Sequence, residues 1–198
     1  MHRRYLLGAG ALALSCFSLS SVAWAANAAE DFVSASILKG FDVLNDANVP
    51  TTERRQRFAT FLLGLTDVRR VALFLLGSYA AKADPADIDA YVAAYRDYIM
   101  SVYQSYFALY AGQSLRVVSS RERAPGDYVV STQVTGGNAA TPIDFRVTTD
   151  GPQPLLLDVA VSGVWLGLAQ RDQFMSVLAA NNGDVKILTS HLRSISHA

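Results

Sequence analysis

Histidine and cysteine, on which most metal sites and much acid–base chemistry depend, are scarce in this sequence. Its 198 residues include three histidines and one cysteine. Cys16 lies in an N-terminal apolar stretch, and His191 and His197 lie at the C-terminal end. The aspartates within residues 84–89 fall at the predicted start of a helix, where the helix dipole stabilises negative charge. The pattern therefore predicts no catalytic residue, no bound metal and no cofactor.

The sequence also lacks an excess of either charge, since 17 Lys and Arg residues balance 17 Asp and Glu residues. Such a balance gives no general attraction to nucleic acid or to anionic lipid surfaces. A long apolar run beyond the N-terminus is missing as well, so we expect no transmembrane helix after residue 25. Nucleic-acid binding and a multi-spanning membrane protein are both disfavoured.

The first 25 residues have the pattern of a secretory signal peptide. Residues 3–4 are both arginine, residues 5–22 are apolar or small, and residues 23–25 place alanines at −3 and −1 of a cleavage site. Cleavage would leave residues 26–198 as a single domain. An uncleaved membrane anchor is the alternative. A lipoprotein signal is disfavoured because the residue three before Cys16 is small.

The first half of the remaining sequence has helical periodicity. We expect helices over residues 29–45, from Thr51 or Thr52 through Leu65, from Asp67 to Gly77, and from Asp84-Pro85 to about Ala111, ending at Gly112. The third is apolar on almost every side and should be buried. The fourth is roughly 40 Å long at 1.5 Å per residue and can span the domain.

The second half changes to a period of two, which is typical of strands with one buried face. Four runs separated by turn residues cover 115–120, 128–134, 143–148 and 155–161, and helices follow over 171–181 and 184–192. We expect the inner side chains of the strands to face the long helix, because a one-residue shift of register would turn them to water. They include Val117, Val130, Phe145 and Leu157.

The order of helices and strands predicts an α+β fold. In it, N-terminal helices pack on one face of a curved, four-stranded antiparallel sheet. C-terminal helices complete the domain, and an apolar cavity lies between the layers.

Aromatic side chains are concentrated in the long helix. They are Tyr91, Tyr95, Tyr98, Tyr103, Tyr106, Phe107 and Tyr110. Aromatics at helical spacing usually form core, but these lie on several sides of the helix, and a buried tyrosine hydroxyl needs a partner or water. A roomy cavity with a partly polar edge, of the kind that holds lipid-sized ligands, would meet that demand. Core packing and cavity lining remain equally open on the sequence alone.

The cavity hypothesis gives a set of candidate lipid-binding residues. The buried stretch at residues 71–76 directly precedes the aromatic-rich helix, which has more apolar faces than one packing seam needs. We expect an acyl chain to bind among Leu73, Leu76, Tyr95, Ile99, Val102, Tyr103, Val130, Phe145 and Leu157. Arg69 and Arg70 could meet a lipid phosphate at the cavity mouth, although a solvated surface pair is the simpler interpretation.

Several short motifs occur in a distinctive order along the chain. They are Asp67 with an apolar helix to Leu76-Gly77; Pro85, Tyr91, Tyr95, Tyr103 and Tyr110-Ala111-Gly112; Asp158-Val159, Gly163-Val164 and Arg171-Asp172-Gln173-Phe174; and Gly183-Asp184. This ordered set resembles the MlaC family, also called the toluene-tolerance family, of periplasmic lipid-binding proteins. The similarity extends from about Phe32 to Leu192.

The resemblance implies a function and two partners. The function is that of a periplasmic carrier, which binds phospholipid acyl chains in an apolar cavity and shuttles lipid between the inner and outer membranes. The partners are an inner-membrane ABC transporter complex and an outer-membrane lipoprotein complex.

Two departures from the family pattern concern the ligand. Members commonly have a tryptophan shortly before the Asp-Val pair, where this chain has Gln153-Pro154, and Tyr79 stands in for an aromatic after the Leu-Gly pair. One branch of the family, the HpnM type, is associated with hopanoid biosynthesis, so a hopanoid carrier or accessory protein is an alternative. A small enzyme with Asp158 and Tyr103 as its polar dyad, and a non-catalytic envelope adaptor, are further alternatives.

Overall fold

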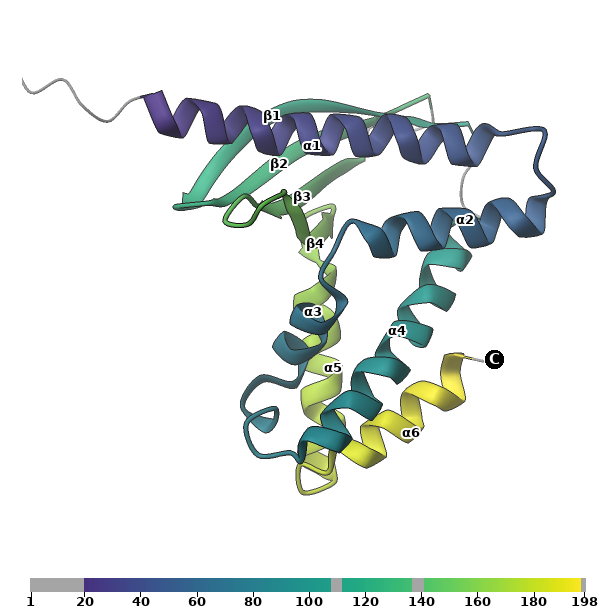
Figure 1. The fold of residues 1–198 in the computed structure, drawn as a ribbon, viewed down its shortest axis with the longest axis vertical. Helices are drawn as coiled ribbons and strands as arrows, with labels where there is room; N and C mark the ends of the chain where they lie inside the picture. Colours follow the sequence, from purple (N-terminus) through teal and green to yellow (C-terminus); the bar gives the residue numbers. More distant parts are fainter. Residues whose placement is uncertain (1–19, 108–111, 137–140, 197–198) are drawn as a thin grey trace, which may run out of the picture.

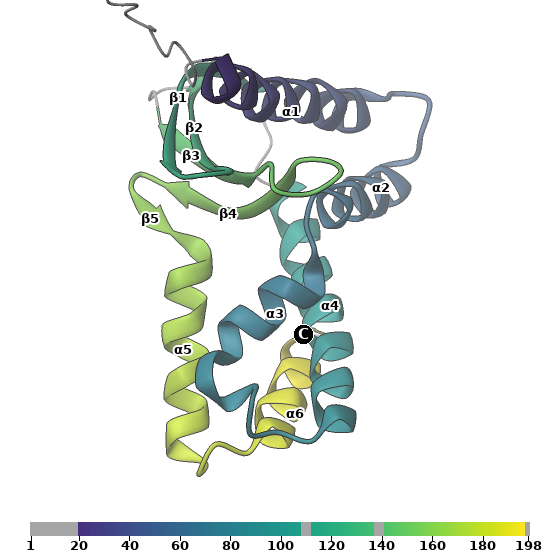
Figure 2. The ribbon, with the colours of Figure 1, turned by 60° about the vertical axis from the view of Figure 1, so that its left-hand side comes forward.

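The computed structural model describes residues 20–107, 112–136 and 141–196 (Figure 1). The elements are α1 (Ser20–Asn45), α2 (Thr51–Gly64), α3 (Val68–Leu76), a 3₁₀ turn (Gly77–Tyr79), α4 (Pro85–Phe107), β1 (Ser114–Ala124), β2 (Asp127–Thr135), β3 (Pro142–Thr148), β4 (Leu155–Val161), β5 (Val164–Trp165), α5 (Leu166–Ala180) and α6 (Val185–Ser196). The sheet with α1 and α2 forms one end of the molecule, and α3, α5 and α6 form the other, with α4 reaching from one to the other (Figures 1 and 2). Within these residues no helix combines the length and the hydropathy needed to cross a membrane.

The sheet is an antiparallel meander of five strands in the order β1-β2-β3-β4-β5. The α+β class is thus confirmed, with one strand more than the four expected. The additional strand, β5, has only two residues, and a strand so short shows no alternation in the sequence. It pairs with β4 across a turn at Ser162 and Gly163, whose φ angles are both positive (50° and 82°). Positive φ at both central residues suits the right-handed twist of a tight hairpin.

Helix α1 covers one face of the sheet, which corrects the expectation that the long helix would do so. Ala29 and Val33 of α1 are buried in a group with Tyr128, Val130 and Val147. We call this group the sheet cluster; its buried residues are Ala29, Val33, Tyr128, Val130, Val147 and Leu156. Figure 1 shows α1 lying along β1 and β2, whereas α4 packs against α6, α2 and α3. The side chains of α1 that meet the sheet recur three and four residues apart, so one stripe of the helix faces the strands.

Two β-bulges change the face alternation that the sequence predicts. In β1 the register shifts between Val117 and Ser119, and Val118 between them is 55% exposed. In β4 the register shifts beside Leu157, so that Leu156 and Val159 both join the sheet cluster. The prediction that alternate residues of β4 all point to the same side of the sheet is therefore wrong. A bulge adds a residue to one strand and reverses the alternation beyond it.

The helices at the other end enclose a second group, which we call the helical cluster. Leu75, Tyr91, Leu178 and Leu188 are fully buried in it. Its buried residues are Ala72, Leu75, Leu76, Ile88, Tyr91, Ala94, Tyr95, Phe174, Leu178, Val185, Leu188 and Leu192. The Phe174 ring meets the rings of Tyr91 and Tyr95 edge-on, with centroids 6.5 and 6.3 Å apart, a favourable geometry for aromatic pairs.

The predicted helix ends are mostly confirmed. Asp67 caps α3 by accepting the Arg70 N–H at 2.9 Å, and α4 begins at Pro85. Helix α2 begins at Thr51, but Pro50 is its N-cap and no side chain caps it, so the expected threonine cap is wrong. Helix α5 begins five residues earlier than expected. The expected end of the long helix near Ala111 lies outside the described residues.

Replacement of Gly126 by alanine tests the turn between β1 and β2. Gly126 has a φ of +72°, and a Cβ there would overlap the Asp150 carboxylate. We expect Gly126→Ala to lower the free energy of unfolding by about 2 kcal/mol, because left-handed backbone and a steric overlap act together. Urea denaturation measures the change. Gly64→Ala is the matched control: a Cβ there meets nothing within 4 Å, and the variant should be neutral or more stable. Equal stability of the two variants would contradict the assigned turn.

Candidate functional site

The candidate lipid-binding residues are divided between the two clusters. Leu76 and Tyr95 are buried in the helical cluster, and Leu73 and Ile99 pack against it. Val130 is fully buried in the sheet cluster, with Phe145 packed against it. Val102, Tyr103 and Leu157 are half-buried and belong to neither cluster. The expected set is therefore not one continuous wall: six of its residues belong to or pack against two separate clusters, and three belong to neither.

Helix α4 spans the distance between the clusters. Its lower part contributes Tyr91 and Tyr95 to the helical cluster, and the Phe107 ring at its upper end lies 6.4 Å from the Phe58 ring of α2. Val102 and Tyr103 occupy the turn of α4 between these two contacts. Figure 2 shows this part of α4 below the curved sheet. Both side chains are half-buried, as are those of Leu73, Ile99, Phe145 and Leu157 in the predicted set.

The hydroxyls of the buried tyrosines have partners, as burial requires. Tyr91 donates to the Ala72 carbonyl at 3.2 Å, and burial raises the pKa of its phenol. Tyr95 donates to Gln170 Oε1 at 3.2 Å, and Gln170 Nε2 donates to the Tyr98 hydroxyl at 3.2 Å. Burial is also the main reason that the pKa of Tyr95 is raised. Tyr91 and Tyr95 are thus core residues, while the Gln170 bridge forms a short polar link between α4 and α5.

Asp158 of β4 uses one of its carboxylate oxygens to cap the start of α5. Oδ1 accepts the N–H groups of Gly167 and Val159, each at 2.8 Å. Gly167 lies in the first turn of α5, whose N-cap residue, Trp165, offers no side-chain cap. A Cβ at Gly167 would lie 2.9 Å from Asp158 Oδ2, so this close approach needs glycine. Burial raises the pKa of Asp158, and the two backbone hydrogen bonds oppose that effect.

This geometry favours a structural role for Asp158 over that of a general base in a dyad with Tyr103. His191 is exposed on α6, as expected, and His197 lies outside the described residues. Between residues 20 and 196, apart from the undescribed loops, no group of three or more His, Cys, Asp or Glu side chains could hold a metal ion.

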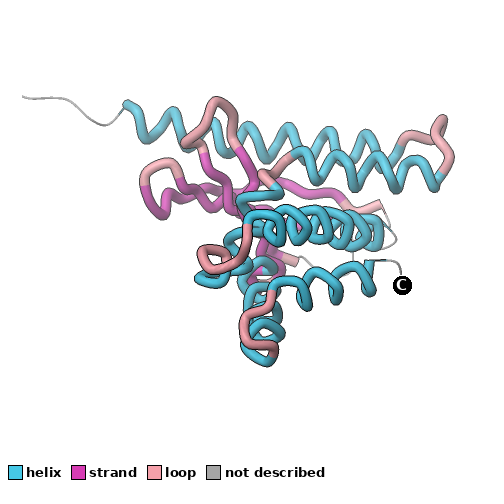
Figure 3. Tube along the Cα trace, turned by 60° about the horizontal axis from the view of Figure 1, so that its bottom comes forward, coloured by secondary structure: helices cyan, strands magenta, loops and turns pink. Residues whose placement is uncertain are grey.

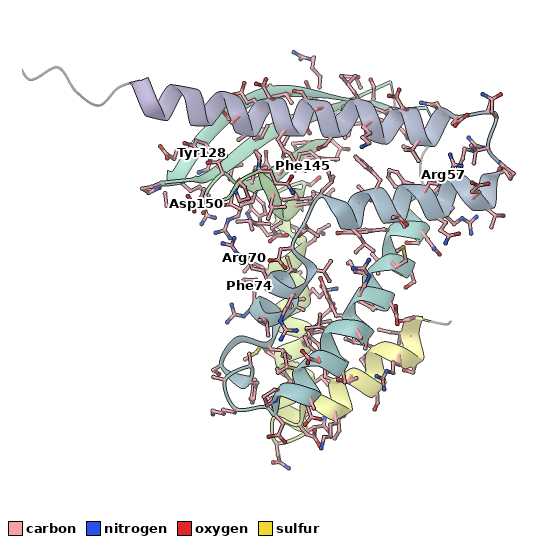
Figure 4. All side chains as sticks on the ribbon, in the orientation of Figure 1. Arg57, Arg70, Phe74, Tyr128, Phe145 and Asp150 are labelled. Carbon is pink, nitrogen blue, oxygen red and sulfur yellow. The ribbon has the colours of Figure 1, made fainter. Side chains whose placement is uncertain are left out.

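The two arginines of α3 have different surroundings. Arg69 forms an exposed ion pair with Asp89, with 2.7 Å between Nη1 and Oδ1. Arg70 is exposed on the same helix, one turn before Phe74 (Figure 4). The guanidinium of Arg171 lies 4.7 Å from the centre of the Phe74 ring. The surface-pair interpretation fits Arg69, which binds a carboxylate of α4.

Two adjoining hollows, which were not predicted from the sequence, lie elsewhere, between α1 and α2. They have volumes of about 450 and 270 Å³, and both are lined by Lys39 and Arg57. The signal available in the sequence was the spacing of polar residues on α2, where Glu53, Gln56, Arg57 and Thr60 fall on one helical face.

The family model described as MlaC protein matches residues 36–194. The chain belongs to the MlaC family. Its structure is similar to that of a phospholipid-binding protein from Ralstonia solanacearum, solved in complex with a phospholipid, with a TM-score of 0.74 and 18% sequence identity. The match covers 85% of this chain and 97% of that chain, and at this identity it establishes the shared fold.

The motif residues that resemble this family are used in the structure to hold elements together. Gly77 ends α3 with φ of 54° and ψ of −130°, a conformation that only glycine adopts readily, and a Cβ there would lie 2.9 Å from Arg171 Nη2. A Cβ at Gly183 would lie 2.6 Å from Cε1 of Tyr79, so that ring packs directly on the glycine. These MlaC motifs therefore identify the fold more than the binding surface.

Paired substitutions of Asp158 separate its capping role from its charge. Asp158→Ala removes the acceptor for two N–H groups and should lower the free energy of unfolding by about 1 kcal/mol. Asp158→Asn keeps an acceptor oxygen without the charge. Since the folded-state pKa of Asp158 is raised, its contribution to stability is greatest below its ordinary pKa of 3.8 and is lost as pH rises through the folded pKa.

Asp158→Asn should therefore gain stability relative to the wild type between pH 4 and neutrality, as measured by urea denaturation. A difference that does not change with pH would contradict the assigned shift, and an alanine variant as stable as the asparagine variant would contradict the cap.

Proposed function

We propose that the protein is a periplasmic carrier that binds the acyl chains of a phospholipid and moves the lipid between the inner and outer membranes. The observation that supports it best is the division of the apolar interior into two clusters, together with half-buried apolar side chains of α4 and β4 that belong to neither cluster. Membership of the MlaC family and the fold shared with a phospholipid-bound protein also support lipid binding. The expected partners are an inner-membrane ABC transporter complex and an outer-membrane lipoprotein complex.

The apolar character of the site suits the energetics of a carrier. Each buried methylene is worth about 0.8 kcal/mol, so extracting one chain of sixteen carbons from a bilayer requires roughly 12 kcal/mol of apolar contact in return. A carrier must also release its lipid, so near-parity with the membrane serves it better than very tight binding. Side chains such as Val102, Tyr103 and Leu157, which are half-buried in the protein without lipid, have surface left to offer an acyl chain.

Export to the periplasm is part of this proposal and depends on removal of residues 1–25. Helix α1 begins at Ser20, so cleavage after Ala25 would fall within it and leave Ala26 as the first residue. Ala29 and Val33, which anchor α1 on the sheet, would be retained. The shortened helix would thus keep its contacts with the strands.

We expect the exported protein to begin at Ala26 and to lack an attached lipid. N-terminal sequencing and intact mass measurement of protein from the periplasmic fraction check this expectation. An intact Met1, or a lipid on Cys16, would contradict it and would indicate a membrane-tethered protein.

Charged substitutions on α4 test the acyl-chain site. Val102→Glu should reduce the lipid that co-purifies with the protein at least tenfold, because an unpaired charge in an apolar site is strongly unfavourable. Ile99→Glu should act in the same way, although Ile99 also packs against the helical cluster. Val118→Glu is the matched control, since Val118 is 55% exposed on β1. Native mass spectrometry measures the lipid, and a thermal melt reports folding.

The outcomes of this experiment distinguish the hypotheses. Loss of lipid with folding retained supports the site. Unfolding of both α4 variants would make these residues ordinary core, and folded variants that still contain lipid would place the site elsewhere. Identification of the extracted lipid separates a phospholipid from a hopanoid, and a wild-type protein without any lipid would favour an adaptor.

A further inference from the structure

Gln170 links α5 to α4 through hydrogen bonds. Its Oε1 accepts the Tyr95 hydroxyl and its Nε2 donates to the Tyr98 hydroxyl, each at 3.2 Å. The backbones of the two helices are supported by other elements, since α3 packs against both of them and α6 runs beside α4 (Figures 2 and 3). The Gln170 bridge, which consists of these three side chains, therefore crosses the space between α4 and α5.

On the side away from the sheet, this space is filled by aromatic rings. Phe174 lies one turn beyond Gln170 on α5, and its ring centre lies 6.5, 6.3 and 6.3 Å from those of Tyr91, Tyr95 and Tyr98. Tyr91 and Phe174 are buried in the helical cluster. Rings packed in this way leave no room for an acyl chain between them. The helical cluster is thus the closed side of the bridge.

On the side toward the sheet lie positions proposed to contact an acyl chain. Tyr95, Tyr98 and Val102 recur at intervals of three and four residues, so Val102 lies on the face of α4 that meets α5, one turn beyond Tyr98. Burial chiefly raises the pKa of the Tyr95 phenol, and the charges of neighbouring groups, including Tyr103 and Asp158, raise it further. Tyr103 of α4 and Asp158 of β4 therefore also lie near Tyr95. The bridge thus separates the packed helical cluster from the half-buried positions of the proposed site.

An acyl chain that reached past the bridge would have to displace it. The Gln170 amide and the Tyr95 hydroxyl, which is buried with its ring, would then lose their partners, and an apolar chain offers none in return. An unpaired buried polar group costs more free energy than the burial of one methylene returns. Several unpaired groups together offset the burial of several methylenes, so the end of the chain is favoured on the sheet side of the bridge.

We propose that Gln170 sets the length of acyl chain that the protein accepts, by holding a polar stop at the inner end of the acyl-chain site. This inference rests on the proposed function, because it concerns the methyl end of the same bound chain. Carbons in excess of the length of the site stay in contact with water, which is unfavourable relative to the bilayer that they have left. A lipid whose chains end at the stop is therefore preferred over a longer one.

A series of lipids that differ only in chain length tests this stop. Detergent-stripped protein is incubated with vesicles that contain equal amounts of phosphatidylcholines with monounsaturated chains of fourteen, sixteen, eighteen, twenty and twenty-two carbons. Native mass spectrometry gives the amount of each bound lipid. In the wild type, bound lipid should fall about tenfold from one member to the next once the chain exceeds the site, because each methylene left in water weakens binding about fourfold.

The variants remove the bridge while keeping the packing around it. Tyr95→Phe combined with Gln170→Leu leaves no buried hydroxyl without a partner, and the fall should move to chains about two carbons longer. Gln173→Leu is the matched control, since Gln173 is exposed on the same helix, and it should bind the series as the wild type does. A thermal melt reports folding. Gln170→Met, which keeps the length of the side chain, replaces the double variant if that variant does not fold.

The possible outcomes separate the stop from lipid binding itself. A shift to longer chains in the bridge variant, without a shift in Gln173→Leu, supports the stop. A fall at the same chain length in the wild type and the folded bridge variant overturns the stop and leaves acyl-chain binding intact, and so does a wild type that binds the whole series equally. An equal shift in Gln173→Leu also overturns it. A wild type that takes up no lipid overturns the proposed function and the stop together.

Discussion

The division of the apolar interior into two clusters is the constraint on which the rest of this structure depends. Within the sheet end, the Leu156 N–H of β4 donates to the Leu65 carbonyl at 2.8 Å, which ties the sheet to the end of α2. The two ends are joined where Asp158 of β4 accepts the Gly167 N–H at the start of α5. Hydrogen bonds of this kind help to fix the relative position of the two halves.

The residues that identify the family serve this arrangement. Gly77 and Arg171 meet where α3 ends against α5, and Gly183 accepts the Tyr79 ring beneath the 3₁₀ turn. Asp158 replaces a local cap for α5. Each motif thus places one element against another, and the positions proposed to face a ligand are half-buried apolar residues outside these motifs. A carrier that must accept and release a flexible chain needs shape and apolar surface from those positions, and it needs rigid geometry from the motifs.

The sequence predicts the elements well and their packing less well, for identifiable reasons. Helical and alternating periodicities reveal every helix and four of the strands, because each buries one face or one stripe. The sequence does not predict which helix packs against the sheet. Both α1 and α4 have apolar residues at helical spacing, and this periodicity does not identify the surface that each helix contacts. The bulge beside Leu157 is also invisible, because an inserted residue leaves the composition of the strand unchanged. Lys39 and the polar face of α2 come together only through the antiparallel pairing of α1 and α2.

The proposed contacts with an acyl chain limit what they can discriminate. Contacts of Val102 or Leu157 with methylenes would depend on area and would scarcely distinguish one acyl chain from another. Selectivity among lipids would therefore have to come from contacts other than these.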